Sequence, residues 1–277
     1  MKVDCTQPRT NGLSSVPASP WLPYRKPQEA ASLRLICFHY AGGSAGIFRN
    51  WQRRVGSDVE VCAVELPGHG MRFSEPLQND IEPLLNLLDN ALAPICSEPF
   101  AVFGHSMGAL LGYAWIERRV RHFATMPDVF IPAGRLPPHL RSNKPRVRSM
   151  NNAALIERLR ELGATPQDIL EHPQFVESFL PIVRADLEIN DSYSNDPKPL
   201  SCPIHVLGGT GDGEAPVGDL QRWGDLTKSD FSQTNFEDGH FFVQSQEMGV
   251  IQQVRSALLS KTFGINSFST SRDTIHH

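Results

Sequence analysis

Ala101-Val102-Phe103-Gly104-His105-Ser106-Met107-Gly108-Ala109-Leu110 is a short apolar run that passes through Gly-x-Ser-x-Gly into a helix-forming segment reaching about Arg119. A strand, a sharp turn and a helix in this order are what a nucleophile elbow requires. Gly104 and Gly108 leave space where the backbone folds back on itself, so Ser106 can adopt a strained conformation with its Oγ exposed. The N–H groups that open the helix favour negative charge nearby. A chance Gly-x-Ser-x-Gly in a loop is the alternative, and the flanking strand and helix argue against it.

The composition is that of a globular protein with one sizeable core. Of 277 residues, 40% are hydrophobic and 20% charged, and a single α/β domain of this length is ordinary. The formal net charge of −4 does not suggest a nucleic-acid binder. No run approaches the roughly 18 apolar residues of a membrane span, and the N-terminus has no apolar signal-peptide core. We therefore expect neither nucleic acid nor a membrane as a partner.

The cysteines are odd in number and widely spaced, without a Cys-x-x-Cys or a close His/Cys cluster. This pattern argues against a metal site or a Cys nucleophile. Three of them lie in or beside strand-like runs and are most simply small core residues in a reducing cytosol, so we expect a cytoplasmic location. The five are Cys5, Cys37, Cys62, Cys96 and Cys202.

Strand-like and helix-like patterns alternate along most of the chain. This alternation predicts an α/β fold with a mainly parallel central sheet flanked by helices. We assign the domain to residues 31–261, after an extended Pro-rich leader over 1–30 and before a polar tail over 262–277 that we expect to be disordered. The predicted strands are 33–38, 59–66, 100–104, 129–133, 204–208 and 231–236, and the predicted flanking helices are 81–95, capped by Asp80, 217–226 and 243–259.

Residues 135–195 break the alternation and contain only helical patterns, at 153–162, 166–170 and 175–190. An insertion here would lie over the C-terminal edge of the sheet, where open α/β folds bind ligands. We interpret it as a lid, with simple helical padding as the alternative. Phe179 and Val183 are candidates for lining a substrate channel, and the alternative is a face buried only against other lid helices. They belong to a helically spaced set of Phe175, Phe179, Ile182, Val183 and Leu187.

A serine nucleophile needs a histidine base within hydrogen-bond reach, and that histidine needs a carboxylate. After such an elbow the chain order is Ser, acid, His. His240 alone follows a last strand, with Gly239 permitting a tight loop, so we assign it as the base. Asp212 ends a strand in a Gly-rich turn and is the preferred acid, although an ordinary turn role is its alternative. Asp238 is the rival acid, but its spacing from His240 is typical of a local turn contact.

The turn after the first strand, residues 39–44, is glycine-rich. It lacks the glycine spacings of dinucleotide- and phosphate-binding loops. Beside a nucleophile elbow, a turn at this place supplies an oxyanion-hole N–H. We therefore assign the two backbone donors to Ala41 and Met107.

Five motifs, in matching order and spacing, resemble those of a type II (stand-alone, editing) thioesterase. This family of the α/β-hydrolase superfamily accompanies nonribosomal peptide and polyketide synthases, and the resemblance covers roughly residues 33 to 260. The sequence departs from the family pattern at His39, where Pro is commoner, and at His69, where Arg is usual, so the preferred acyl group stays open. The motifs are Tyr40-Ala41-Gly42-Gly43, Leu66-Pro67-Gly68 with Arg72, Gly104-His105-Ser106-Met107-Gly108-Ala109, Gly209 with Asp212, and Gly239-His240-Phe241-Phe242.

The resemblance implies hydrolysis of acyl groups from the phosphopantetheine arm of acyl or peptidyl carrier domains, through an acyl-Ser106 intermediate. It implies no cofactor of the enzyme's own, because the substrate carries the 4′-phosphopantetheine. A carboxylester hydrolase or acyltransferase with the same triad is the alternative within enzymes, since the triad does not select the leaving group. An inactive hydrolase fold kept as a binding module is the alternative outside enzymes.

A basic stretch precedes the predicted lid helices. Residues 135–150 contain five basic side chains and no Asp or Glu, although the whole chain is negative. Arg pairs well with phosphodiester and carboxylate groups, so Arg146 and Arg148 are candidates for docking a carrier domain. The alternative is a solvated basic loop. The five are Arg135, Arg141, Lys144, Arg146 and Arg148.

Overall fold

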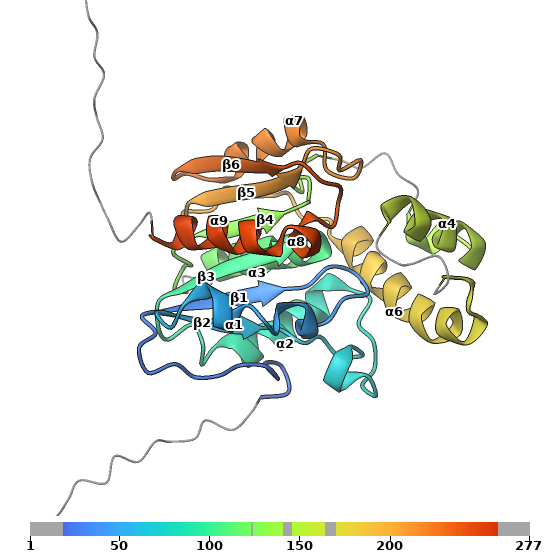
Figure 1. The fold of residues 1–277 in the computed structure, drawn as a ribbon, viewed down its shortest axis with the longest axis horizontal. Coiled ribbons are helices and arrows are strands. Elements are labelled where there is room, and N and C mark those ends of the chain that lie inside the picture. The colour runs from blue at the N-terminus through green and yellow to red at the C-terminus, as the bar shows by residue number, and fades with distance from the viewer. Residues whose placement is uncertain (1–18, 123, 141–145, 164–169, 260–277) are drawn as a thin grey trace, which may run out of the picture.

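The computed structural model describes residues 19–122, 124–140, 146–163 and 170–259 (Figure 1). Within these ranges six parallel strands form one sheet in the order β2-β1-β3-β4-β5-β6. The predicted α/β class and parallel sheet are therefore confirmed. The strands are β1 (Leu33–Phe38), β2 (Val59–Ala63), β3 (Phe100–His105), β4 (Phe130–Ala133), β5 (Ile204–Gly209) and β6 (Phe231–Phe236).

Burial explains why the strands are near-continuous apolar runs. Every residue of β3 and β4 is buried, as expected where helices cover both faces of a parallel sheet, whereas β6 is an edge strand with exposed residues. Strand β2 ends at Ala63, short of the predicted end at residue 66. The reason is that the Glu65 N–H bonds the Trp21 carbonyl instead of a neighbouring strand.

Helices on the two faces of the sheet enclose two separate apolar cores. On one face, α2 (Ile81–Leu92) and α3 (Met107–Arg121) bury residues such as Trp115. On the other face, α1 (Gln52–Val55) and α9 (Glu247–Leu259) bury residues such as Trp51. Figure 1 shows α1 and α9 in front of the sheet and α3 behind it. Helix α2 ends at Leu92, before the predicted residue 95, and the chain continues in turns.

Two helices predicted as continuous are divided. Residues 217–226 form α7 (Val217–Leu220) and a 3₁₀ helix, η4 (Gln221–Leu226), in which Trp223 is buried and donates its Nε1–H to the Arg135 carbonyl at 2.7 Å. Residues 243–259 form α8 (Phe242–Ser245) and α9. The helix is broken between them because Gln246 has φ −110° and ψ 29°, outside the helical region.

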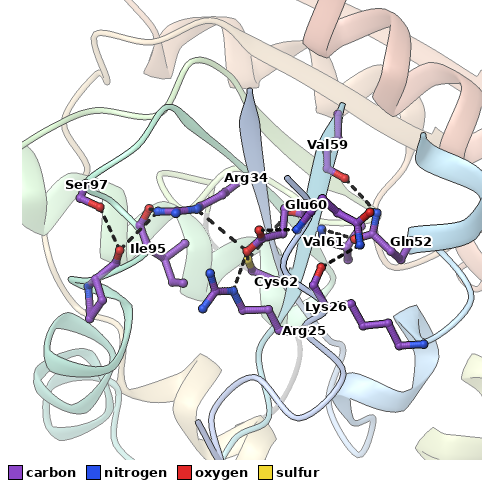
Figure 2. A network of polar contacts seen from close by, with 12 residues as sticks. Arg25, Lys26, Arg34, Gln52, Val59, Glu60, Val61, Cys62, Ile95 and Ser97 are labelled. Atoms are coloured by element: carbon purple, nitrogen blue, oxygen red, sulfur yellow. Dashed lines mark hydrogen bonds and ion pairs between the residues drawn. The ribbon is translucent and has the colours of Figure 1, made fainter. Parts of the chain in front are cut away.

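The segment before β1 packs over β2, although the sequence predicts an extended leader through residue 30. Leu22 is buried in the core beside α2. Glu60 of β2 is buried and accepts a hydrogen bond from Arg25 Nε at 2.6 Å, with Arg34 Nε at 4.0 Å (Figure 2). Because Leu22 has apolar surface to bury and Glu60 needs a cation, the packed part of the chain begins inside the predicted leader.

The helical insertion lies beyond the C-terminal ends of the strands (Figure 1). Its described parts are η3 (Val147–Ser149), α4 (Asn152–Leu162) and α6 (Pro173–Ser192), while the predicted helix at 166–170 falls almost wholly outside the described residues. Among the described helices, none combines the length and apolar character that a membrane span requires. The insertion has its own buried apolar cluster of Val147, Leu155, Leu159, Leu170, Leu180, Val183 and Leu187.

Candidate active site

Ser106 sits in a strained turn between β3 and α3. Its φ of 55° and ψ of −113° make it the one non-glycine residue with positive φ among those the structure describes. The strain is held by close backbone packing on both sides. A Cβ added to Gly104 would lie 2.2 Å from the Gly108 carbonyl oxygen, and one added to Gly108 would lie 2.3 Å from that of Phe38. Both glycines are therefore required by sterics, as a nucleophile elbow demands.

His240 and Asp212 complete a hydrogen-bonded chain to Ser106. His240, in the turn between β6 and α8, has its Nε2 3.0 Å from Ser106 Oγ and its Nδ1 2.8 Å from Asp212 Oδ2. The other carboxylate oxygen, Asp212 Oδ1, accepts the N–H groups of Glu214 at 2.8 Å and Ala215 at 3.2 Å. The three side chains predicted to work together thus lie in contact and in the predicted order.

Asp212 is ionised at neutral pH despite its burial. Burial raises the pKa of this carboxyl group, but the hydrogen bond to His240 and the backbone N–H bonds outweigh burial and hold it below its ordinary value. The carboxylate thereby holds His240 Nδ1–H and leaves Nε2 free to accept the Ser106 proton. The side chain of the rival Asp238 bonds nearby groups, the Gly239 N–H at 2.7 Å and the Ser245 hydroxyl, and does not bond His240.

The predicted oxyanion donors lie on either side of Ser106. Met107 is the first residue of α3, where an N–H has no partner within the helix. Ala41 follows β1 and lines the same cavity as Ser106. The next N–H, that of Gly42, is already bound to Asp186 at 2.7 Å. Of these two neighbouring N–H groups in the loop, Ala41 is therefore the one available to a substrate oxygen.

A cavity of about 230 Å³ opens above Ser106 and His240 between the sheet and the insertion. Phe179 and Val183, predicted from helical spacing, line its apolar wall together with Leu187. Polar side chains also line it. Arg135 donates to Asn190 Oδ1 at 3.1 Å, and Arg158 lies 3.8 Å from Glu214. The lining residues are Tyr40, Ala41, Gly42, Ser106, Arg135, Arg158, Leu159, Leu162, Phe179, Val183, Leu187, Asn190, Glu214, His240 and Phe241.

Comparison with known proteins agrees with this geometry. The thioesterase domain family matches residues 33–258. The chain belongs to the thioesterase family. This membership confirms the resemblance inferred from the five motifs.

Three of its relatives show how far the similarity extends. The thioesterase chain is 33% identical to linear gramicidin dehydrogenase LgrE of Brevibacillus parabrevis, over 90% of this chain and 96% of LgrE. The RedJ thioesterase of the prodiginine pathway in Streptomyces coelicolor is 31% identical, with a TM-score of 0.78 over 87% of this chain and 99% of RedJ. BorB, a type II thioesterase from the borrelidin cluster, is 28% identical, with a TM-score of 0.75 over 85% of this chain and 96% of BorB.

The two docking candidates of this thioesterase are exposed. Arg146 and Arg148 flank Val147 at the start of the insertion, and the Val147 N–H bonds Asp191 Oδ2 at 2.8 Å. Arg135, counted with them in the basic stretch, instead faces the cavity, where burial lowers its pKa to about 10. There it donates a hydrogen bond to Asn190, which is 55 residues away in the sequence. Arg141 and Lys144 lie outside the described residues.

Sequence reasoning missed two groups of polar residues around this site. His105, to which the sequence patterns assigned no role, has its Nε2 2.8 Å from the His240 carbonyl oxygen. Burial lowers the pKa of His105 to about 3, so a neutral His105 donates this hydrogen bond and supports the loop of the base. A buried His on a central strand is the signal that could have found it. No local signal links Gly42 to Asp186, which lies 144 residues later.

Proposed function

We propose that this chain is a stand-alone type II thioesterase that hydrolyses acyl groups from the phosphopantetheine arm of carrier domains, and so clears a nonribosomal peptide or polyketide synthase. The observation that carries the proposal is the hydrogen-bonded Asp212–His240–Ser106 chain, whose Ser106 and His240 line a cavity of about 230 Å³. Membership of the thioesterase family and similarity to BorB and RedJ, both from biosynthetic pathways, support it.

Acylation begins with Ser106. Its Oγ attacks the thioester carbonyl carbon as His240 Nε2 takes the hydroxyl proton, and Asp212 stabilises the resulting imidazolium. The carbonyl oxygen becomes an oxyanion that the Ala41 and Met107 N–H groups stabilise. When the tetrahedral intermediate collapses, the C–S bond breaks and His240 returns the proton to the departing thiolate. The products are a free phosphopantetheine thiol and acyl-Ser106.

Deacylation repeats these steps with water as the nucleophile. His240 removes a proton from water, the hydroxide oxygen bonds to the acyl carbon, and the same two N–H groups stabilise the new oxyanion. The bond from carbon to Ser106 Oγ then breaks and the proton returns to Ser106. A carboxylic acid is released and the enzyme is restored. Asp212 holds the same His240 tautomer in both halves of the reaction.

The partner in this proposal is an acyl or peptidyl carrier domain, and no cofactor of the enzyme's own takes part because the phosphopantetheine arrives with the substrate. The exposed Arg146 and Arg148 support docking, since a carrier presents a phosphodiester at the root of its arm. The four cysteines of the described chain are buried thiols, which supports a cytoplasmic location.

The test is mass spectrometry of a panel of acylated carrier proteins before and after addition of the enzyme, with Ser106→Ala as the inactive control. Acyl-coenzyme A and oxygen esters of the same acyl groups are measured in parallel. Faster hydrolysis of carrier thioesters supports the proposal. If the protein prefers oxygen esters, it is a carboxylester hydrolase. If it transfers the acyl group to an added alcohol or thiol, it is an acyltransferase. If Ser106 does not react with a fluorophosphonate, the protein is a binding module.

A further inference from the structure

The two peptide groups that flank Ala41 are each fixed by side chains outside the triad. The Tyr40 carbonyl oxygen accepts from His39 Nδ1 at 2.9 Å and from the Gly43 N–H at 2.9 Å. The described peptide bonds contain no cis bond, so the Ala41 N–H points opposite to that oxygen. The hydrogen bonds to the Tyr40 carbonyl oxygen therefore fix the direction in which the Ala41 N–H, the predicted oxyanion donor, points.

The second peptide is held by the lid helix. Its N–H, that of Gly42, donates to Asp186 Oδ2 at 2.7 Å, and Asp186 is a fully buried residue of α6. Asp186 shares one face of α6 with Phe179 and Val183, at helical spacing. A Cβ added to Gly42 would lie 2.9 Å from both of those side chains, so α6 rests directly on the loop.

His69 is the second hydrogen-bond partner of Asp186 in this buried place. His69 Nε2 lies 3.0 Å from Asp186 Oδ2, and its Nδ1 lies 3.0 Å from the Pro67 carbonyl oxygen. Both ring nitrogens face acceptors, which only the imidazolium satisfies at once. Burial lowers the pKa of His69, but the hydrogen bond and charge of Asp186, with a smaller effect of Glu65, raise it above its ordinary value.

The neighbouring His39 is neutral. Its ring centroid lies 5.0 Å from that of His69. Burial and the adjacent charge of His69 lower the pKa of His39 to about 4, against the opposing effect of Asp186. A neutral His39 donates through Nδ1 to the Tyr40 carbonyl, while its Nε2 has no hydrogen-bond partner among the described residues. His39 and His69 are the two positions where the sequence departs from the family pattern.

We propose that Asp186, hydrogen-bonded to His69, is a positioning residue that holds the Ala41–Gly42 peptide and so, together with His39 on the preceding peptide, orients the Ala41 N–H as an oxyanion donor, so that lid helix α6 completes the oxyanion hole. The inference rests on the proposed function of the Ser106 site. Its consequence is that catalysis requires a docked lid. Movement of α6 away from the loop would remove the acceptor from Gly42 and release the Ala41–Gly42 peptide.

The experiment compares three variants by melting temperature, by kcat and KM on a butyryl thioester of N-acetylcysteamine, and by the rate of Ser106 labelling with a fluorophosphonate. His69→Met with Asp186→Leu removes the buried ion pair and the acceptor together, which avoids stranding one buried charge. Asp186→Asn keeps an oxygen acceptor for Gly42. Glu188→Gln is the matched control, because Glu188 lies on the same helix and accepts from the exposed Asn79 at 3.0 Å.

We expect the double variant to lose about 10²-fold in both kcat and labelling rate, with KM nearly unchanged, because an oxyanion donor is misplaced. Asp186→Asn should lose about tenfold, and Glu188→Gln should match the wild type. A folded double variant with wild-type kcat and labelling would overturn the proposal, as would a loss confined to KM. If the double variant is unfolded, the nearly isosteric Asp186→Asn tests the proposal instead, through its kcat and its rate of Ser106 labelling.

The labelling rate also separates this inference from the proposed function. A wild-type protein that labels rapidly but cleaves no carrier thioester would contradict the proposed function alone. A wild-type protein that cleaves carrier thioesters, with a folded Asp186 double variant equally fast, would contradict the positioning role alone.

Discussion

Four buried histidines surround the catalytic centre, and their contacts give them three different roles. His240 accepts the Ser106 proton, while His105 and His39 are neutral and donate to backbone carbonyls. His69 faces acceptors with both ring nitrogens. One residue type thus supplies a base, two neutral donors and a cation, because local hydrogen-bond partners and burial select the state of each ring.

Replacing Asp212 by Asn is expected to lower kcat on a short acyl thioester by about 10⁴, because the amide favours the wrong His240 tautomer. Asp238→Asn is the matched control, since the Asp238 carboxylate bonds the Gly239 N–H and the Ser245 hydroxyl and is not bonded to His240. It should stay within a few-fold of the wild type. Steady-state kinetics of both variants check this. A larger loss in Asp238→Asn would mean that the acid is misassigned.

Stability should fall as the pH drops from about 7 to about 5, through the buried neutral histidines. Burial lowers the pKa of His105 to about 3 and that of His39 to about 4, whereas an unfolded His titrates near 6.5. Between these values the unfolded chain binds more protons, so each histidine removes on the order of 2 kcal/mol by pH 5. The raised pKa of His69 acts oppositely, because its contribution is full at low pH and is lost as the pH rises.

Urea unfolding at pH 7 and pH 5 measures this slope. His105→Gln should reduce the drop in unfolding free energy between the two pH values. This difference is independent of the stability that the variant loses at pH 7 with the hydrogen bond to His240. The same drop in wild type and variant would remove His105 from the explanation.

Helix α6 contacts the catalytic domain and the cavity through one face. Phe179, Val183 and Leu187 line the cavity, and Asp186 reaches the loop after β1. The helix also belongs to the apolar cluster of the insertion. The face is therefore not buried against other lid helices alone, because a single helix face is wide enough to meet the lid core and the cavity together.

Phe179→Ala should enlarge the cavity beside Ala41 and Gly42 and shift the acyl preference to longer chains. We expect the ratio of kcat/KM between octanoyl and butyryl thioesters to rise by about tenfold. Val176→Ala is the matched control, since Val176 packs in the lid cluster on the same helix but does not line the cavity. If folded Phe179→Ala keeps the wild-type preference for acyl chain length, the Phe179 ring has only a structural role.

Across the domain, the edge strand β2 is wholly buried because the preceding segment and a network centred on Glu60 cover it (Figure 2). Edge strands otherwise expose unpaired backbone groups. The covering segment includes Leu22, which is 3% exposed. Residues ahead of the first strand are thus part of the folded unit.

A chain beginning at residue 31 should be less stable than one beginning at residue 19. It loses the burial of Leu22, which costs about 2 kcal/mol, while Glu60 loses Arg25 but becomes exposed to water and so adds little. Melting temperatures of the two chains measure the difference, and Leu22→Ala in the longer chain separates the apolar part. Equal melting temperatures would show that this segment covers β2 without stabilising it.

Surface charge beside the insertion should matter only for a macromolecular substrate. Changing both Arg146 and Arg148 to Glu should lower kcat/KM on an acyl-carrier protein by about tenfold at low salt, with a smaller deficit at high salt. A small acyl thioester should be hydrolysed at the wild-type rate. Arg49→Glu with Arg53→Glu is the control, because it makes the same charge change at exposed residues near α1. Equal losses on both substrates would indicate a damaged pocket instead of a docking defect.

The sequence by itself identified the strands, the nucleophile elbow and the order Ser106, Asp212, His240. These depend on local properties: apolar periodicity, glycines where the backbone must pass closely, and polar residues at strand ends. It also placed Phe179 and Val183 on the face that lines the cavity. What it could not give is which distant side chains meet.

The contact of Asp186 with Gly42 spans 144 residues, and that with His69 spans 117. The position of the Arg135 side chain at the cavity and the burial of Leu22 likewise depend on contacts between distant parts of the chain. The reason is physical: a local pattern fixes which face of a helix is apolar, but its position over the sheet is set by close packing of all its neighbours. That position determines which polar atoms come within hydrogen-bond distance of the catalytic loops.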